Sequence, residues 1–155
     1  MLPLVELLDS FLRGAVLISL SVALGGVAWG LWVLQARRGR APASAVHRCL
    51  VLLAGGAAAL GVGQAALLGL KAHALSVSLG RDVLVDFAGT LHFIAGAARA
   101  VLGLVLAGLA VAAMRRPAAR MSWAWLSILA GLVAASGAWL THAAGRVEHR
   151  PLLML

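Results

Sequence analysis

The sequence predicts an all-α protein, a transmembrane four-helix bundle. Of its 155 residues, 63% are hydrophobic and only 12% are charged, whereas soluble domains carry about 25% charged residues. The apolar residues are gathered into four long runs. Each run approaches the roughly 20 residues that a helix needs to cross the bilayer core. We therefore expect one transmembrane domain over residues 1–155.

The four apolar runs place the expected helices at residues 12–34, 49–70, 91–114 and 122–142. Pro42 and Pro117 fall in the connections, where they interrupt no helix. The first run is not expected to be a signal peptide, because it is long enough to span and no basic segment precedes it. The single cysteine, Cys49, excludes an internal disulfide.

Arginine clusters predict the orientation of the helices. The first and third connections carry arginines and no acid. These arginines are Arg37, Arg38, Arg40, Arg48, Arg115, Arg116 and Arg120. The positive-inside rule puts both connections in the cytoplasm. Both termini and the second connection, residues 71–92, then face the periplasm of a bacterial inner membrane.

Small residues recur at four-residue spacing along the runs, as in the pair Gly26 and Gly30 and the series Gly55, Ala59 and Gly63. Such spacing lets helix backbones approach closely in lipid. It predicts tight packing within the bundle, and a homo-oligomer is compatible with the same pattern.

Two arginines lie within or next to the apolar runs. Arg13 follows Asp9 by one helical turn, which predicts an ion pair between them. Arg99 follows His92 on the same helical face, about 10 Å further along the helix. A charge at that depth costs roughly 2.5–3.5 kcal/mol. We therefore expect Arg99 to face the bundle interior as a structural or gating charge, paired with a polar group or a backbone carbonyl.

Four of the five histidines fall on the periplasmic side of this topology, and only His47 is cytoplasmic. The four are His73, His92, His142 and His149. Imidazole is a common ligand for copper and zinc. A single histidine at a helix end is usually just an interfacial polar residue, so the grouping carries the prediction: a metal site of His142 with His92 and His73. Asp86 and Glu6 lie on the same side, where either can orient a ligand histidine.

The C-terminal segment 136-SGAWLTHAAGRVEHRPLLML-155 resembles the CopD family of bacterial copper-resistance and copper-transport membrane proteins. Members have a helix that ends in a small-residue His-Ala-Ala motif, followed by a polar stretch with arginine. The segment 96-GAARAVLGLVL-106 is similar to the arginine-containing third helix of the family. His142 matches the family motif, and Arg99 matches less closely. Members usually continue into four more helices, so the chain is either a natural half or a fragment of an eight-helix protein.

The resemblance implies an inner-membrane protein that captures copper at the periplasmic face and transports it toward or across the membrane. It also implies a copper ion at the site and a periplasmic copper-carrying protein as a partner, alongside the lipid bilayer. One alternative is a b-type haem protein in which His92 and His142 ligate the iron. Another is an assembly subunit that binds no metal.

Two classes of function are not expected. The runs contain no nucleophile–base arrangement, phosphate loop or paired-carboxylate site, so the sequence does not predict an enzyme. Aromatic residues make up 5% and there is no tyrosine, so no stacking platform for nucleic acid is visible. The excess of basic residues is explained by the cytoplasmic connections.

Cysteine labelling tests the topology. In a background with Cys49 replaced by alanine, a cysteine at Ser78 should react with an impermeant reagent added from the periplasm. A cysteine at Ala118 should react only after the cytoplasmic side is opened. The reverse pattern would place the histidine group inside the cell and remove the basis for periplasmic copper capture.

Overall fold

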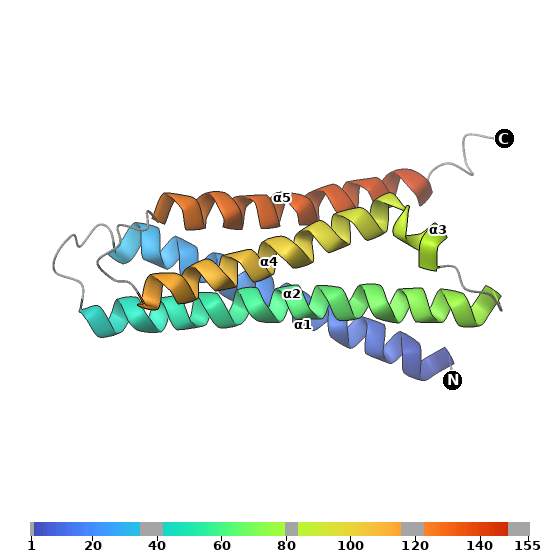
Figure 1. The fold of residues 1–155 in the computed structure, drawn as a ribbon, viewed down its shortest axis with the longest axis horizontal. Coiled ribbons are helices and arrows are strands. Elements are labelled where there is room, and N and C mark those ends of the chain that lie inside the picture. The colour runs from blue at the N-terminus through green and yellow to red at the C-terminus, as the bar shows by residue number, and fades with distance from the viewer. Residues whose placement is uncertain (1, 35–41, 80–83, 116–122, 149–155) are drawn as a thin grey trace.

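The computed structural model describes residues 2–34, 42–79, 84–115 and 123–148, and all the secondary structure within these ranges is helical (Figure 1). For residues 2–5, 33–34, 84 and 138–148 the description covers the backbone alone. The elements are α1 (Leu2–Trp29), continued by the π-helical turn η1 (Gly30–Leu34), α2 (Ala43–Leu79), the short α3 (Leu84–Ala88), α4 (Leu91–Arg115) and α5 (Trp123–Glu148).

Each of the four apolar runs lies in a helix, but three helices extend beyond the expected ends. α4 agrees with the expected range 91–114. In contrast, α1 begins at Leu2, α5 continues to Glu148 and α2 continues to Leu79, beyond the expected end at residue 70. The segment after residue 70 contains neither glycine nor proline up to Leu79, so nothing in it stops the helix where the apolar run ends.

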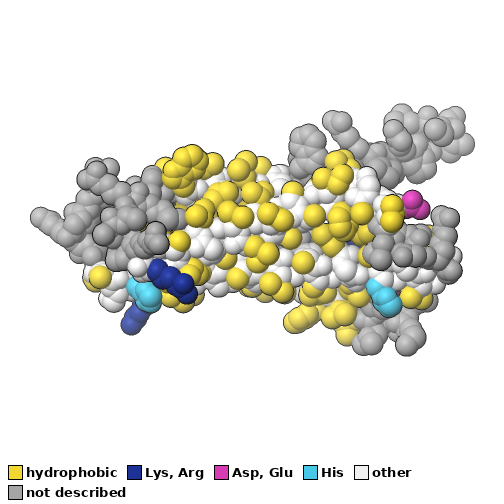
Figure 2. Space-filling model, in the orientation of Figure 1, with side chains coloured by type: hydrophobic (Ala, Val, Ile, Leu, Met, Phe, Trp, Pro, Cys, Tyr) yellow, Lys and Arg dark blue, Asp and Glu magenta, His cyan; other side chains and the backbone are white. Residues whose placement is uncertain are grey.

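Three of the helices are long and apolar enough to cross a membrane: α1 with η1 over Glu6–Trp32, α2, and α4. The described side chains of α5 form a shorter apolar stretch, Trp123–Gly137. Large hydrophobic side chains are exposed on the outside of these helices. Figure 2 shows them spread along the bundle, with lysine and arginine near one end and an acid near the other. This surface is that of a membrane protein.

α2 lies at the centre of the bundle and packs against both α1 and α4. α5 packs mainly against α4 and also against α1. The N-terminal ends of α1 and α4, the C-terminal ends of α2 and α5, and α3 all lie at the same end of the bundle, on the right in Figure 1. We call this the α3 end.

The interface between α2 and α4 depends on glycines that face each other's backbones. A Cβ on Gly61 would lie 2.9 Å from the carbonyl oxygen of Ala100, and a Cβ on Gly103 would lie 3.1 Å from that of Ala57. Of the small residues that recur at four-residue spacing, Gly26 also meets a neighbouring helix, since a Cβ there would lie 3.3 Å from Cβ of Leu53. A Cβ on Gly30 would meet Trp123 of α5, and a Cβ on Gly63 would lie 2.9 Å from the side chain of Val16 in α1, but Gly55 has nothing within 4 Å. The four-residue spacing therefore predicted close packing correctly at Gly26, Gly30 and Gly63, and not at Gly55.

Replacing Gly61 by alanine should destabilise the bundle by about 1–3 kcal/mol, because the new methyl group meets the backbone of α4 at Ala100 as well as the side chain of Leu104. Gly55→Ala, on the same helix, is the matched control and should be neutral or slightly stabilising, since alanine favours helix. Unfolding by SDS in mixed micelles measures both. Equal stability of the two variants would contradict the close approach of α2 and α4.

Candidate functional site

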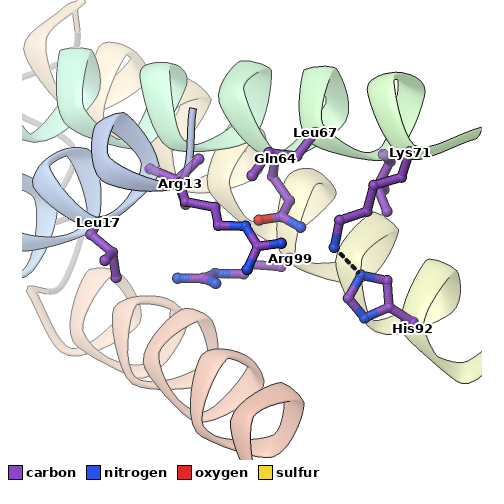
Figure 3. A pocket seen from close by; sticks show the side chains of 9 residues that line it. Arg13, Leu17, Gln64, Leu67, Lys71, His92 and Arg99 are labelled. Atoms are coloured by element: carbon purple, nitrogen blue, oxygen red, sulfur yellow. Dashed lines mark hydrogen bonds between the residues drawn. The ribbon is translucent and has the colours of Figure 1, made fainter. Parts of the chain in front are cut away.

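A polar pocket of about 240 Å³ lies between α1, α2 and α4 (Figure 3). Its polar lining residues are Arg13, Gln64, Lys71, His92 and Arg99. Its apolar lining residues are Val16, Leu17, Leu67 and Leu68. We call this the polar pocket. Lys71 and His92 lie nearest to the α3 end, and Arg99 lies deeper in the bundle.

Helical periodicity brings these side chains together. Gln64 and Lys71 are two turns apart on α2, and His92 and Arg99 are two turns apart on α4. Residues two turns apart share a face of a helix. The two faces meet where α2 packs on α4, so an amide, an imidazole and two cations are directed into one space (Figure 3).

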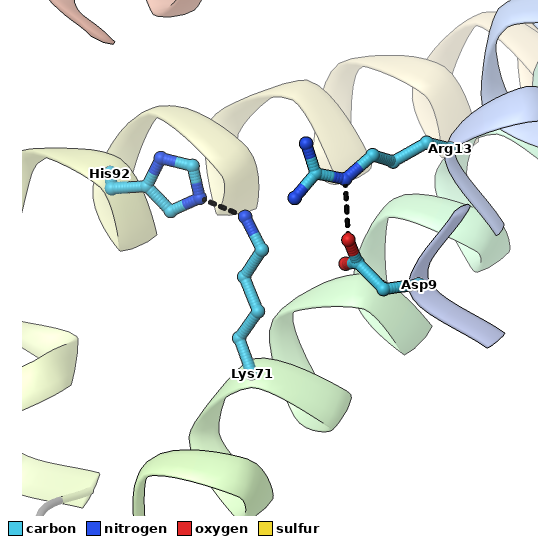
Figure 4. A network of polar contacts seen from close by, with 4 residues as sticks. All are labelled: Asp9, Arg13, Lys71 and His92. Atoms are coloured by element: carbon cyan, nitrogen blue, oxygen red, sulfur yellow. Dashed lines mark hydrogen bonds and ion pairs between the residues drawn. The ribbon is translucent and has the colours of Figure 1, made fainter. Parts of the chain in front are cut away.

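Lys71 and His92 join α2 to α4 at the outer part of the polar pocket. The Nζ atom of Lys71 lies 2.9 Å from Nε2 of His92 (Figure 4). A lysine ammonium can only donate hydrogen bonds, so a charged Lys71 donates to Nε2 of His92 in the tautomer that carries its proton on Nδ1. This ring nitrogen is therefore already occupied.

Asp9 and Arg13 form the ion pair that their spacing predicts. Nε of Arg13 lies 2.7 Å from Oδ2 of Asp9. The bond uses Nε, and Figure 4 shows the terminal nitrogens of Arg13 directed away from Asp9. Oδ1 of Asp9 is buried and has no hydrogen-bond partner among the described atoms.

Arg99 is the most deeply buried charge of the described part of the chain. Its side chain is 8% exposed, in agreement with the expectation that it faces the bundle interior. The guanidinium lies over Gly137 of α5, where a Cβ would be 3.3 Å from Nη2. The expected partner is not found among the described residues, and Nε of Arg99 is both buried and unbonded. A buried charge without a partner is costly, so its retention needs an explanation.

The other residues expected at a metal site are spread over the α3 end. His73 is exposed on α2, and it lies two residues after Lys71, roughly 200° around the helix and away from the polar pocket. Asp86 is exposed on α3, and Glu6 is exposed on α1. Position 142 belongs to the last turns of α5, but the side chain of His142 lies outside the described residues, as does the whole of His149.

His92 is therefore brought together with Lys71 and not with His73. Within the described ranges, no three histidine, cysteine or acidic side chains lie close enough to hold a metal ion. Gln64 and Lys71 are the site residues that the sequence argument missed. A signal for them was present, because Gln64 is an amide within an apolar run and Lys71 follows it by two helical turns.

Comparison of the chain with family models, curated proteins and solved structures finds no match. The resemblance of residues 136–155 to the CopD family therefore stays a prediction. What the site does has to be argued from its residues and from the fold.

A double-mutant cycle tests the contact between Lys71 and His92. Lys71→Met and His92→Phe should show a coupling of about 1 kcal/mol in unfolding free energy, because each single change already removes the hydrogen bond. Lys71→Met and His73→Ala should be additive, since their side chains lie on different faces of α2. Coupling of Lys71 to His73 instead of His92 would overturn this assignment of helix faces.

Proposed function

We propose that the protein handles copper in a bacterial inner membrane, capturing it at the periplasmic face and transporting it toward or across the membrane. His142 and His92 are the principal ligands in this proposal. The main support for the proposal is that two helix ends lie at the same end of the bundle. These are the start of α4, which carries His92, and the last turns of α5, which include position 142. The CopD resemblance of the segment around His142 supports the same reading.

The chemistry of capture follows from the surroundings of His92. A neutral imidazole is a good copper ligand, and a hydrogen bond donated by the Lys71 ammonium, whose Nζ lies 2.9 Å from Nε2 of His92, favours the form in which Nε2 is unprotonated. Copper that binds at Nε2 takes the place of the Lys71 ammonium, which can turn toward water. Asp86 and Glu6 are exposed at the same end, where their negative charges favour the approach of a cation.

The capture site lies at the mouth of the polar pocket rather than inside it. Three cationic side chains line the pocket, and the adjoining acid, Asp9, is paired with one of them, Arg13. A copper ion would be repelled there, and the repulsion is stronger in an apolar bundle than in water. Arg99 is therefore proposed as a charge that controls access to the interior, not as a ligand.

Substitution of His142 tests the proposal. His142→Ala should lower copper affinity about tenfold or more, because loss of a ligand costs at least as much as loss of a group that orients one. His47→Ala is the matched control, since His47 is an exposed histidine at the opposite end of α2, and it should bind copper like the parent. Bound copper per protein is measured on detergent-purified protein after dialysis against a chelator.

An optical spectrum of the same samples separates the alternatives. A Soret band that disappears in both His142→Ala and His92→Ala would replace copper by haem b. Protein without bound metal or haem would favour an assembly subunit with incidental histidines. Copper that is lost in His47→Ala and kept in His142→Ala would contradict both the site and its sidedness.

A further inference from the structure

We infer that the polar pocket is a binding site for a phosphate group, supplied either by free phosphate or by the headgroup of an anionic lipid. The inference goes beyond the proposed function and does not depend on copper. It starts from the charges that the bundle gathers in one place.

The polar pocket has an excess of positive charge. Arg13, Lys71 and Arg99 line it from three different helices. The adjoining carboxylate, Asp9, is bound to Nε of Arg13, and its single negative charge is too small to balance all three cations. Cations on membrane helices are expensive and are normally paired. An anion in the pocket would neutralise the remaining charge.

The most deeply buried cation of the polar pocket has a donor without an acceptor among the described residues. Arg99 is 8% exposed, and its Nε atom is buried without a hydrogen-bond partner among the described residues. Gln64, which also lines the pocket, is 7% exposed. Figure 3 shows the amide of Gln64 and the guanidinium groups of Arg13 and Arg99 directed into the same space. Buried donors normally have a partner, so this arrangement indicates an acceptor that the described residues do not supply.

The shape of these donors selects an oxyanion. A guanidinium binds two oxygens of a phosphate in parallel, and a lysine adds a point charge. A volume of about 240 Å³ is far larger than the roughly 30 Å³ occupied by one water. It therefore has room for a tetrahedral group with several oxygens, each facing a different donor.

The apolar residues that line the polar pocket make an anionic lipid one possible source of the phosphate group. Val16 and Leu17 of α1 line the pocket, and Leu17 is 60% exposed on the outside of the helix. A headgroup in the pocket could thus leave its acyl chains along the apolar surface of α1. A free phosphate would instead enter past Lys71 and His92.

Thermal stability of the delipidated protein in a neutral detergent tests the inference. Inorganic phosphate should raise the melting temperature of the parent saturably at constant ionic strength, or phosphatidylglycerol in mixed micelles should do so when phosphatidylcholine does not. The first result identifies free phosphate as a ligand, and the second identifies a lipid headgroup. Absence of both effects overturns the inference.

Arg99→Met is the variant that should lose the effect, with an apparent affinity about tenfold or more weaker. Arg115→Met, an exposed arginine in the last turn of the same helix, is the control and should respond like the parent. If Arg99→Met does not fold, Lys71→Met takes its place, because Lys71 is only partly buried. An equal response of the pocket variant and Arg115→Met would show that the anion binds elsewhere, and would overturn the assignment.

Discussion

The burial of Arg99 is the constraint on which the rest of the site depends. Its guanidinium lies among four apolar helices, where an isolated charge is strongly disfavoured. It fits only because α5 presents Gly137, which has no side chain, against it. α2 and α4 also pack closely through Gly61 and Gly103, which fixes the helix that carries Arg99. The fold thus holds a charged group in a fixed, buried position beside a polar pocket, and charged groups inside a membrane bundle are functional candidates.

Hydropathy was sufficient to find the helices because it reports which segments are stable in lipid. It did not find the C-terminal end of α2, because the helix continues after the apolar run through residues 71–79, which contain neither glycine nor proline. This difference matters for the site. The helical extension fixes the rotation of Lys71 and His73 about α2, so that Lys71 turns toward the polar pocket and His73 turns away.

The positive-inside rule predicts which side of a membrane a residue faces, but it does not predict which face of a helix the residue occupies. For that reason the histidines were grouped by side, while the structure pairs His92 with Lys71 across the helix interface. The interior position of Arg99 was predictable because lipid exposure is so costly for a charge. Its lack of a partner among the described residues was not predictable, since it depends on how α2, α4 and α5 pack around it.

The two proposals are linked by electrostatics. His92 lies at the mouth of the polar pocket, and the cations of the pocket raise the free energy of any metal ion bound there. A phosphate group beside Arg99 and Lys71 would cancel part of this repulsion and would also compete with His92 for the Lys71 ammonium. Bound anion would then favour copper at Nε2 of His92. By thermodynamic reciprocity, bound copper would favour the anion by the same factor. The proposed copper-capture site is therefore compatible with a cationic pocket beneath it, because on these two proposals the pocket's charge would make metal binding depend on a second ligand.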